Sequence, residues 1–328
     1  MSFFLGIDVG SSKTHALIVD ETGRVVGIGS GGAGNHETVG YDGLERVLRD
    51  VTGQALAQGG LALDQIAGAG LGLAGLDWDM ELDAHLARIR AIGLAAPVEA
   101  VNDALIGLAA AASDGWGIAV VSGTGCNCRG WDRGRRRRGQ MTGASSWMGE
   151  GAGATELMGK AIQAVAHAWT RRGPATAMTD VFMAHTRAPS VPHLLHGLAE
   201  GCYVVPPSLA PYVFTVAEQG DAVARELIAW AGRELGEMVN AVVRQLEFQA
   251  LDFDVVLLGS MFNGGPRLTA PLAEPVRPVA PGARFVRLNA PPVAGAVLLG
   301  MELGGIDLST LRPRVLESVR AAFAANGD

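Results

Sequence analysis

Three glycine-rich turns, each following a short apolar segment, are the parts of this sequence best suited to chemistry. They read Asp8-Val9-Gly10-Ser11-Ser12-Lys13-Thr14, Ser122-Gly123-Thr124-Gly125-Cys126-Asn127 and Leu258-Gly259-Ser260-Met261-Phe262-Asn263-Gly264-Gly265. Such turns can present backbone N–H groups and hydroxyls in a concave array, which suits phosphate oxygens. One turn alone is as compatible with an ordinary hairpin, but three of them, two built alike, favour a polyphosphate site. None has the spacing of a Walker P-loop or a Rossmann fingerprint.

Two aspartates accompany these turns. Asp8 stands at the mouth of the first turn, where a carboxylate beside polyphosphate would be repelled unless Mg²⁺ lay between them. Asp103, in Val101-Asn102-Asp103-Ala104, follows a short apolar segment and opens a helix. It could act as the general base that takes a proton from a hydroxyl attacking a γ-phosphate. Each has a plainer alternative, because Asp8 could cap its own turn and Asp103 could cap its helix.

The elements that must position these groups alternate between short strands and helices. Strands are predicted at residues 3–9, 15–20, 25–29, 66–73, 98–101, 117–122, 126–131, 253–258 and 284–288. Helices are predicted at residues 41–58, 84–92, 103–112, 155–169, 222–248 and 292–301, with short helical pieces between 170 and 211. The first three strands form a meander whose layout recurs at 117–131, which predicts a duplicated β-meander domain. Residues 132–139 are predicted as a turn, and residues 321–328 as a frayed end.

Composition narrows the class of protein. Glycine contributes 46 of 328 residues, about twice its usual share. A net charge of −7 disfavours a nucleic-acid binder. The sequence contains no uninterrupted apolar stretch of about 18 residues, so no membrane span is predicted. The N-terminus lacks the pattern of a signal peptide. Three cysteines, Cys126, Cys128 and Cys202, favour a reducing compartment, so we expect a cytoplasmic protein.

The chain resembles the N-acetylglucosamine kinase-like kinases of the BadF/BadG/BcrA/BcrD ATPase group, in the actin–hexokinase–Hsp70 superfamily. The resemblance covers most of the chain. Its most specific segments are 122–129, which reads SGTGCNCR, and Gly34-Asn35-His36. Further matching segments are 6–14, 101–104, 148–150, 219–221, 258–260 and 292–296.

The resemblance implies an α/β protein with two ribonuclease-H-like, actin-type ATPase domains and an interdomain cleft. The domains would span 1–114 and 115–328, the second with a helical insertion, and the helix at 292–301 would be the segment that can return to the first domain. The implied reaction transfers the ATP γ-phosphate to the 6-hydroxyl of an amino sugar, first of all N-acetylglucosamine. Glucosamine or another hexosamine is the alternative substrate.

The resemblance also implies roles for individual residues. Asp103 would be the catalytic base, and Asp8 would hold Mg²⁺ through water. ATP would be bound by Gly10, Ser11, Ser12, Lys13, Thr14, Gly123, Thr124, Gly125, Ala217, Gly259 and Ser260. The sugar would be bound by Asn35, His36, Asp103, Cys126, Asn127, Gly143, Ala144, Ser145 and Glu150.

Departures from the family pattern concern the sugar side. Glu150 stands where the family usually has an aspartate, and Cys126 replaces a serine. Two other classes remain open: an activator ATPase that drives a partner enzyme, and a sugar sensor without activity. The expected partner is the amino sugar, with no nucleic acid and no membrane, and a homodimer is an option because dimers are common in the resembled family. The basic run at 133–138 is predicted to be a solvated hairpin tip.

Overall fold

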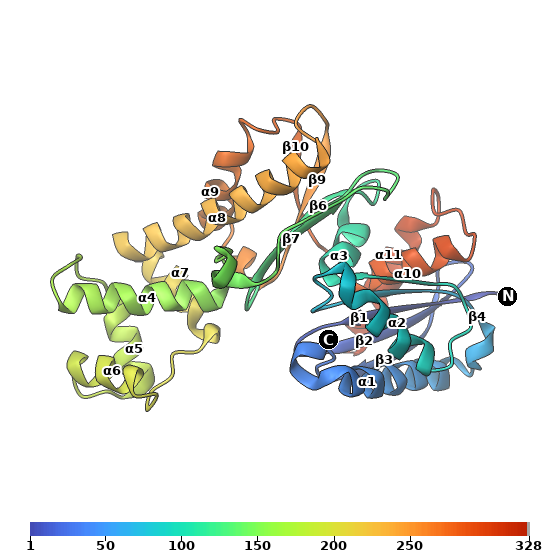
Figure 1. The fold of residues 1–328 in the computed structure, drawn as a ribbon, viewed down its shortest axis with the longest axis horizontal. Coiled ribbons are helices and arrows are strands. Elements are labelled where there is room, and N and C mark those ends of the chain that lie inside the picture. The colour runs from blue at the N-terminus through green and yellow to red at the C-terminus, as the bar shows by residue number, and fades with distance from the viewer. Residues whose placement is uncertain (327–328) are drawn as a thin grey trace.

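Two five-stranded sheets organise the computed structural model, which describes residues 1–326 (Figure 1). The first sheet contains β1 (Phe3–Val9), β2 (Thr14–Asp20), β3 (Val25–Gly31), β4 (Ile66–Leu73) and β5 (Val98–Asn102). The second contains β6 (Gly117–Ser122), β7 (Cys126–Trp131), β8 (Arg138–Gln140), β9 (Phe253–Leu258) and β10 (Ala283–Arg287). The short strand β8 begins inside the segment 132–139, which was predicted as a turn.

The two sheets have the same topology. The strand orders are β3-β2-β1-β4-β5 and β8-β7-β6-β9-β10. In each sheet the first three strands pair antiparallel, and the remaining two run parallel to the central strand. The predicted duplication of the meander is therefore confirmed. Because β1, β4 and β5 run parallel, their carboxyl ends meet at one edge of the first sheet.

Helices cover both faces of the first sheet. One face packs on α1 (His36–Gly59) and α2 (Leu82–Ala91), through apolar side chains such as Leu48 and Ile89. The other face packs on α10 (Val293–Leu303) and α11 (Arg312–Asn326), which come from the end of the chain. The expectation of a frayed end is wrong for residues 321–326, because Val319 and Phe323 are buried in that core. Residues 327–328 lie outside the described part.

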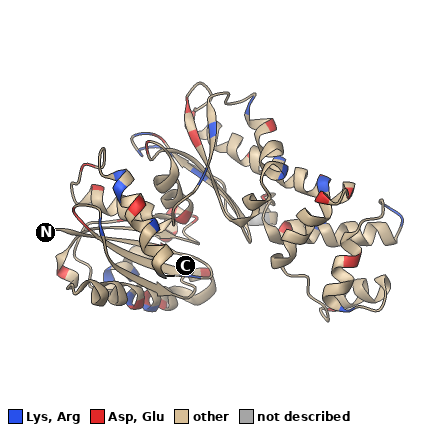
Figure 2. Cartoon of the chain, turned by 180° about the vertical axis from the view of Figure 1, so that it is seen from behind, with Lys and Arg blue, Asp and Glu red and all other residues tan. Residues whose placement is uncertain are grey.

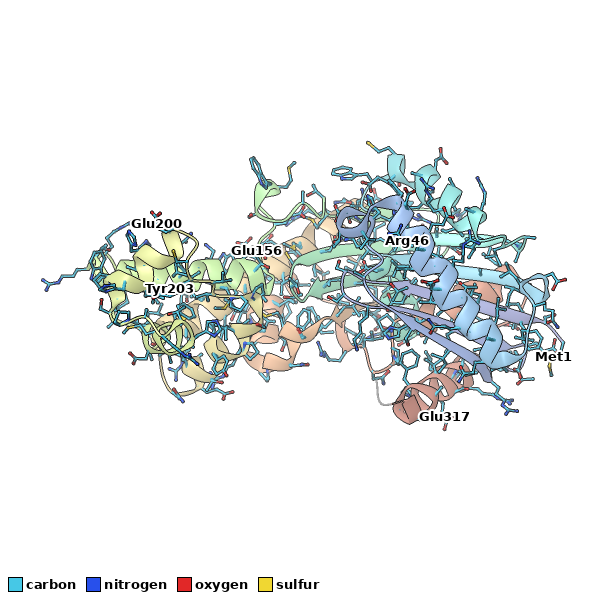
Figure 3. All side chains as sticks on the ribbon, turned by 90° about the horizontal axis from the view of Figure 1, so that it is seen from below. Met1, Arg46, Glu156, Glu200, Tyr203 and Glu317 are labelled. Atoms are coloured by element: carbon cyan, nitrogen blue, oxygen red, sulfur yellow. The ribbon has the colours of Figure 1, made fainter. Side chains whose placement is uncertain are left out.

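The second half carries most of the remaining helices. The 25-residue α8 (Ala222–Leu246) packs on α9 (Pro266–Val276), which was missed in the sequence because Pro271 and Pro275 lie within it. On α8 also pack α4 (Ala154–Trp169) and α7 (Ala210–Glu218). Both contact α5 (Met178–Thr186), which in turn packs on α6 (Val191–Ala199). Glu200 and Tyr203, just after α6, lie at the opposite end of the molecule from Met1 (Figure 3). Basic and acidic residues are interspersed along both halves (Figure 2).

The helix α3 (Asp103–Ala111) lies between the two sheets. It contacts β4 and β5 on one side and β6, β7 and β9 on the other, and α10 packs along it. The crossing with α10 is close, since a side chain at Gly295 would overlap the carbonyl oxygen of Ile106. The domain boundary near residue 114 stays a prediction. No described helix is both long enough and apolar enough to cross a membrane.

The α3–α10 crossing leads to a stability prediction. We expect Gly295→Ala to lower the free energy of unfolding by about 1–3 kcal/mol, because the added methyl group forces two helix backbones apart. Urea unfolding followed by circular dichroism measures the change. Gly159→Ala in α4 is the matched control, because nothing lies within 4 Å of that added methyl group. It should be neutral or stabilising by about 0.5–1 kcal/mol. Equal stabilities of the two variants would contradict the close crossing.

Candidate active site

The two predicted phosphate turns form hairpin tips at corresponding places in the two sheets. In the β1–β2 tip, the Gly10 amide donates to the carbonyl of Lys13 at 2.9 Å. In the β6–β7 tip, the Gly123 amide donates to the carbonyl of Gly125, also at 2.9 Å. Each tip is therefore closed by a glycine amide onto its own turn. Ser11, Ser12, Lys13 and Thr124 are exposed at these tips.

One predicted ATP ligand has a structural task. Thr14 is fully buried, and its hydroxyl donates to the carbonyl of Gly32 at 2.9 Å. Ser11 contacts a residue predicted to bind the sugar, because its hydroxyl accepts a hydrogen bond from the Asn35 side-chain amide at 3.2 Å. The first phosphate turn is thereby connected to a residue of the predicted sugar side.

A pocket of about 530 Å³ opens beside the second phosphate turn. The predicted residues Gly123, Thr124 and Ser260 line it. Gly259 has a φ of 99° and lies against the Ser122 carbonyl, which leaves no room for a side chain there. Ala217 is buried in α7 and does not line the pocket. Met261, Asn263 and Gly264 of the third glycine-rich turn also line it. Sequence reasoning missed the lining residues in α7 and just before it: Pro207, Ser208, Pro211, Phe214, Thr215 and Glu218.

The predicted sugar residues of the second half surround a loop that follows β8. Glu150 is buried, and its carboxylate accepts hydrogen bonds from the amides of Thr142 at 2.7 Å and Gly143 at 2.9 Å. Glu150 thus shapes the loop that carries Gly143 and Ala144. The Cys126 thiol accepts a hydrogen bond from the Ala152 amide at 3.2 Å, on the same stretch of chain. Ser145 begins the short turn Ser145–Met148, and its side chain lies outside the described part.

Asn35 and His36 begin α1 on the opposite side of the cleft. The Asn35 side chain caps the helix by accepting from the Glu37 amide at 2.9 Å. The ring of His36 stacks on Tyr41 with centroids 4.6 Å apart. Gly75, after β4, approaches both residues so closely that a side chain there would collide with Asn35.

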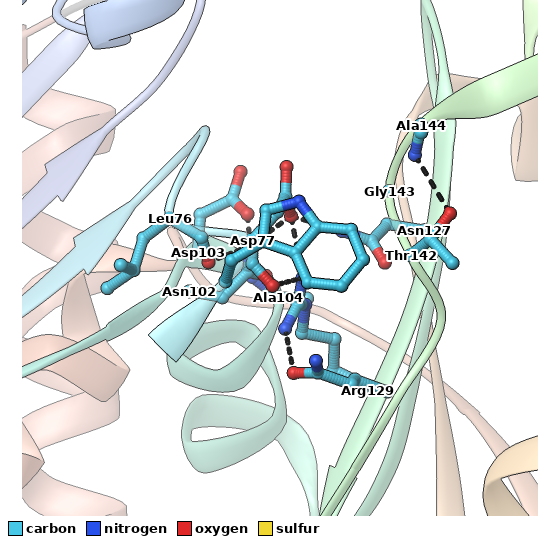
Figure 4. Close-up of polar contacts among 12 residues, drawn as sticks. Leu76, Asp77, Asn102, Asp103, Ala104, Asn127, Arg129, Thr142, Gly143 and Ala144 are labelled. Atoms are coloured by element: carbon cyan, nitrogen blue, oxygen red, sulfur yellow. Dashed lines mark hydrogen bonds and ion pairs between the residues drawn. The ribbon is translucent and has the colours of Figure 1, made fainter. Parts of the chain in front are cut away.

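Asp77 joins these groups and was missed in the sequence. Its Oδ1 accepts from Arg129 at 2.6 Å, from Asn127 at 3.2 Å and from Asn102 at 3.2 Å (Figure 4). A side-chain carbon at Gly143 would lie 2.7 Å from its carboxyl carbon. The signal that could have found it is its place: like Asp8 and Asp103, it lies at or just beyond the carboxyl end of a parallel strand.

Three carboxylates therefore gather at one edge of the first sheet. Enclosure by protein, and then the neighbouring Asp103, raise the pKa of Asp8 to about 7. The same burial, and then Asp77, raise the pKa of Asp103 to about 6, although the Ala104 amide and Arg129 act in the opposite direction. Burial also raises the pKa of Asp77, against the effect of Arg129. Asp103 is the first residue of α3, and Asn102 caps that helix, so the capping alternative for Asp103 is not what the fold uses.

This geometry defines an actin-like, two-lobed nucleotide-dependent enzyme: duplicated sheets, paired hairpin tips and carboxylates at the strand ends between them. The pattern of the BadF/BadG/BcrA/BcrD ATPase family matches residues 5–300, and the chain belongs to that family. The family and the fold predicted from the sequence are confirmed.

Individual relatives support this placement. The N-acetylmuramic acid/N-acetylglucosamine kinase of Clostridium acetobutylicum is 27% identical over 268 residues, covering 80% of this chain and 86% of that protein. The N-acetyl-D-glucosamine kinase of Dictyostelium discoideum is 23% identical over 314 residues, covering 91% and 97%. A solved structure of a provisionally assigned N-acetylglucosamine kinase from Chromobacterium violaceum superposes with a TM-score of 0.69 at 23% identity, covering 91% and 99%, and shows the same fold.

The crowded carboxylates lead to a prediction for the protein without nucleotide or metal. We expect Asp8→Asn to raise the free energy of unfolding at pH 8 by about 1–2 kcal/mol, because the wild-type carboxylate is ionised there against a raised pKa. The advantage should shrink as the pH falls towards 4, where the folded carboxyl group is protonated and no longer carries a buried charge. Urea unfolding in the presence of a chelator measures it. A variant that is less stable at pH 8 would contradict the electrostatic account.

Proposed function

We propose that this protein is an ATP-dependent kinase that phosphorylates the 6-hydroxyl of an amino sugar, with N-acetylglucosamine as the first candidate substrate. One observation carries the proposal. The carboxylate of Asp103 stands at the end of β5 among the residues predicted to hold the sugar, on the sheet edge that also bears the first phosphate turn. The names of the two relatives in the same family support an amino sugar as the acceptor.

The proposed reaction follows from these groups. Backbone amides and hydroxyls of the two hairpin tips would hold the ATP phosphates, and the 530 Å³ pocket would take the nucleoside. The sugar 6-oxygen attacks the γ-phosphorus while its proton passes to the Asp103 carboxylate. The bond between the γ-phosphorus and the bridging oxygen breaks, and ADP leaves with that electron pair. Closure of the two halves would keep water from the γ-phosphate.

The family also implies Mg²⁺ with the nucleotide, and the residues here fit such an ion. Asp8 faces a second carboxylate, and a cation beside it would remove the cost of ionising it. When bound, the ion would neutralise charge on the phosphates. Asp8 would hold it through water.

Two further assignments complete the proposal. All three cysteines are free thiols, which fits a reducing cytosol. Cys126 and Cys128 are buried on one face of β7, which argues against a cluster shared with a second subunit and therefore against the activator alternative. A homodimer stays a prediction from the family resemblance.

An ADP-release assay across several sugars tests the function. The panel is N-acetylglucosamine, glucosamine, N-acetylmannosamine, N-acetylmuramic acid and glucose, with mass spectrometry to locate the phosphate. We expect N-acetylglucosamine to give the highest kcat/KM. ATP hydrolysis that no sugar stimulates would favour the activator, and the absence of turnover would favour the sensor.

Asp103→Asn tests the base. We expect kcat to fall about 10²- to 10⁴-fold while N-acetylglucosamine still binds, because asparagine can accept hydrogen bonds but cannot take the proton. Steady-state kinetics and calorimetric titration of the sugar measure the two effects. Near-normal turnover in this variant would remove Asp103 from the mechanism.

The pH dependence of kcat/KM provides a separate test, because it reports ionisation of the enzyme before the sugar binds. The base must be ionised, and its pKa is raised to about 6, so kcat/KM for the sugar should be half-maximal near pH 6 and fall tenfold for each pH unit below that. An unperturbed aspartate would hold activity to about pH 4. Initial rates at sugar concentrations well below KM, between pH 4.5 and 8, decide between these profiles, with circular dichroism to confirm folding. A flat profile down to pH 4.5 would contradict the raised pKa.

A further inference from the structure

One carboxylate oxygen connects the two halves of the molecule. Oδ1 of Asp77 receives three side-chain donors (Figure 4). The shortest of these hydrogen bonds, 2.6 Å, comes from Nη2 of Arg129 on β7, and Asn127 on the same strand donates at 3.2 Å. The third comes from Asn102, at the end of β5 in the first half, also at 3.2 Å. Asp77 itself follows β4 of the first half.

On the first half, this contact reaches the proposed base. The Asn102 side chain donates to Asp77 and to the Leu76 carbonyl, and its own oxygen accepts from the Ala104 amide at 3.0 Å. Asp103 Oδ1 accepts from that same amide at 2.9 Å. A shift of Asn102 would therefore disturb the hydrogen bond that orients the carboxylate of Asp103.

On the second half, further hydrogen bonds of Arg129 hold its guanidinium against Asp77. Arg129 also donates to the Asp77 carbonyl at 3.1 Å and to Gln140 on β8 at 2.6 Å. Its side chain is only 5% exposed, and that of Asp77 is 16% exposed. A guanidinium in this setting cannot leave its carboxylate without a large cost, because the uncompensated charge would remain buried.

We propose that Asp77 is a positioning residue: through Asn102 it sets the carboxylate of Asp103, and through Arg129 and Asn127 it ties that setting to the second half. The inference rests on the proposed function and deepens it. The base is correctly oriented only while β7 lies against the segment after β4. Misplacing a catalytic group by about 1 Å can cost about 100-fold in rate.

Asp77→Asn is the sharpest variant, because it removes the charge that pairs with Arg129 and keeps an oxygen in the same place, whose two lone pairs can serve Arg129 and one asparagine. We expect kcat to fall roughly 10- to 100-fold. The dissociation constant of ADP should stay within about threefold, since the nucleotide pocket contains none of this network. The dissociation constant and KM of N-acetylglucosamine should also stay within about threefold, because the Asn127 side chain keeps the hydrogen bond that it accepts from the Cys128 amide. Asp79→Asn is the matched control: Asp79 is exposed two residues further on, and its variant should keep wild-type kcat.

Arg129→Gln and the double variant provide the second measurement. If Asp77 and Arg129 act as one unit, the double variant should lose no more kcat than the worse single variant. The variants are compared by steady-state kinetics and calorimetry, with circular dichroism to confirm the fold. A kcat within threefold of wild type in Asp77→Asn would overturn the proposal. So would a tenfold rise in sugar KM at unchanged kcat, which places Asp77 on the substrate, or a tenfold loss of ADP affinity, which indicates general damage. The proposed function fails separately, if no sugar stimulates the wild-type protein.

Discussion

Crowding of negative charge at one edge of a parallel sheet is the constraint on which the rest of this structure depends. Asp8, Asp77 and Asp103 lie at or just beyond the carboxyl ends of the neighbouring strands β1, β4 and β5, and each is partly withdrawn from water. Like charges so placed raise one another's pKa values unless other groups compensate them. The fold meets this problem in three different ways. Asp77 is paired with a buried arginine, Asp103 lies at the N-terminus of α3, and for Asp8 we propose a cation.

The ion pair between Asp77 and Arg129 joins residues of both halves in one site. Arg129 belongs to the duplicated sheet, and its partner belongs to the first one. The same contact brings Asn127 and the loop after β8 to the carboxylates, with Glu150 holding that loop by two backbone amides. The departure from the family pattern at Glu150 is therefore accommodated as a loop anchor, since its carboxylate is occupied by the protein's own backbone.

Helix α3 packs against strands of both sheets. It lies between the sheets, and its first residue is the proposed base. The helices of the chain's end pack against the first sheet, so the C-terminal segment closes a core begun by the N-terminal strands. Two arginines of the basic run at 133–138 form ion pairs with residues of other segments. Arg135 pairs with Glu302 of α10 at 2.5 Å, and Arg137 with Glu247 at 3.1 Å, so part of the predicted solvated tip contacts its neighbours.

Local sequence determined the strands other than β8, the glycine turns and the candidates Asp8 and Asp103, because backbone conformation and strand-end position depend on neighbouring residues. The duplicated meander could also be predicted, since both copies repeat the same strand–turn–strand pattern. Helix α9 could not, because its prolines argue locally against a helix that packing on α8 supports. The place of Asp77, the pocket beside Phe214 and the structural role of Thr14 were decided by tertiary structure alone. Each depends on contacts between segments far apart in the chain, and such contacts leave no periodic or spacing signal in one sequence.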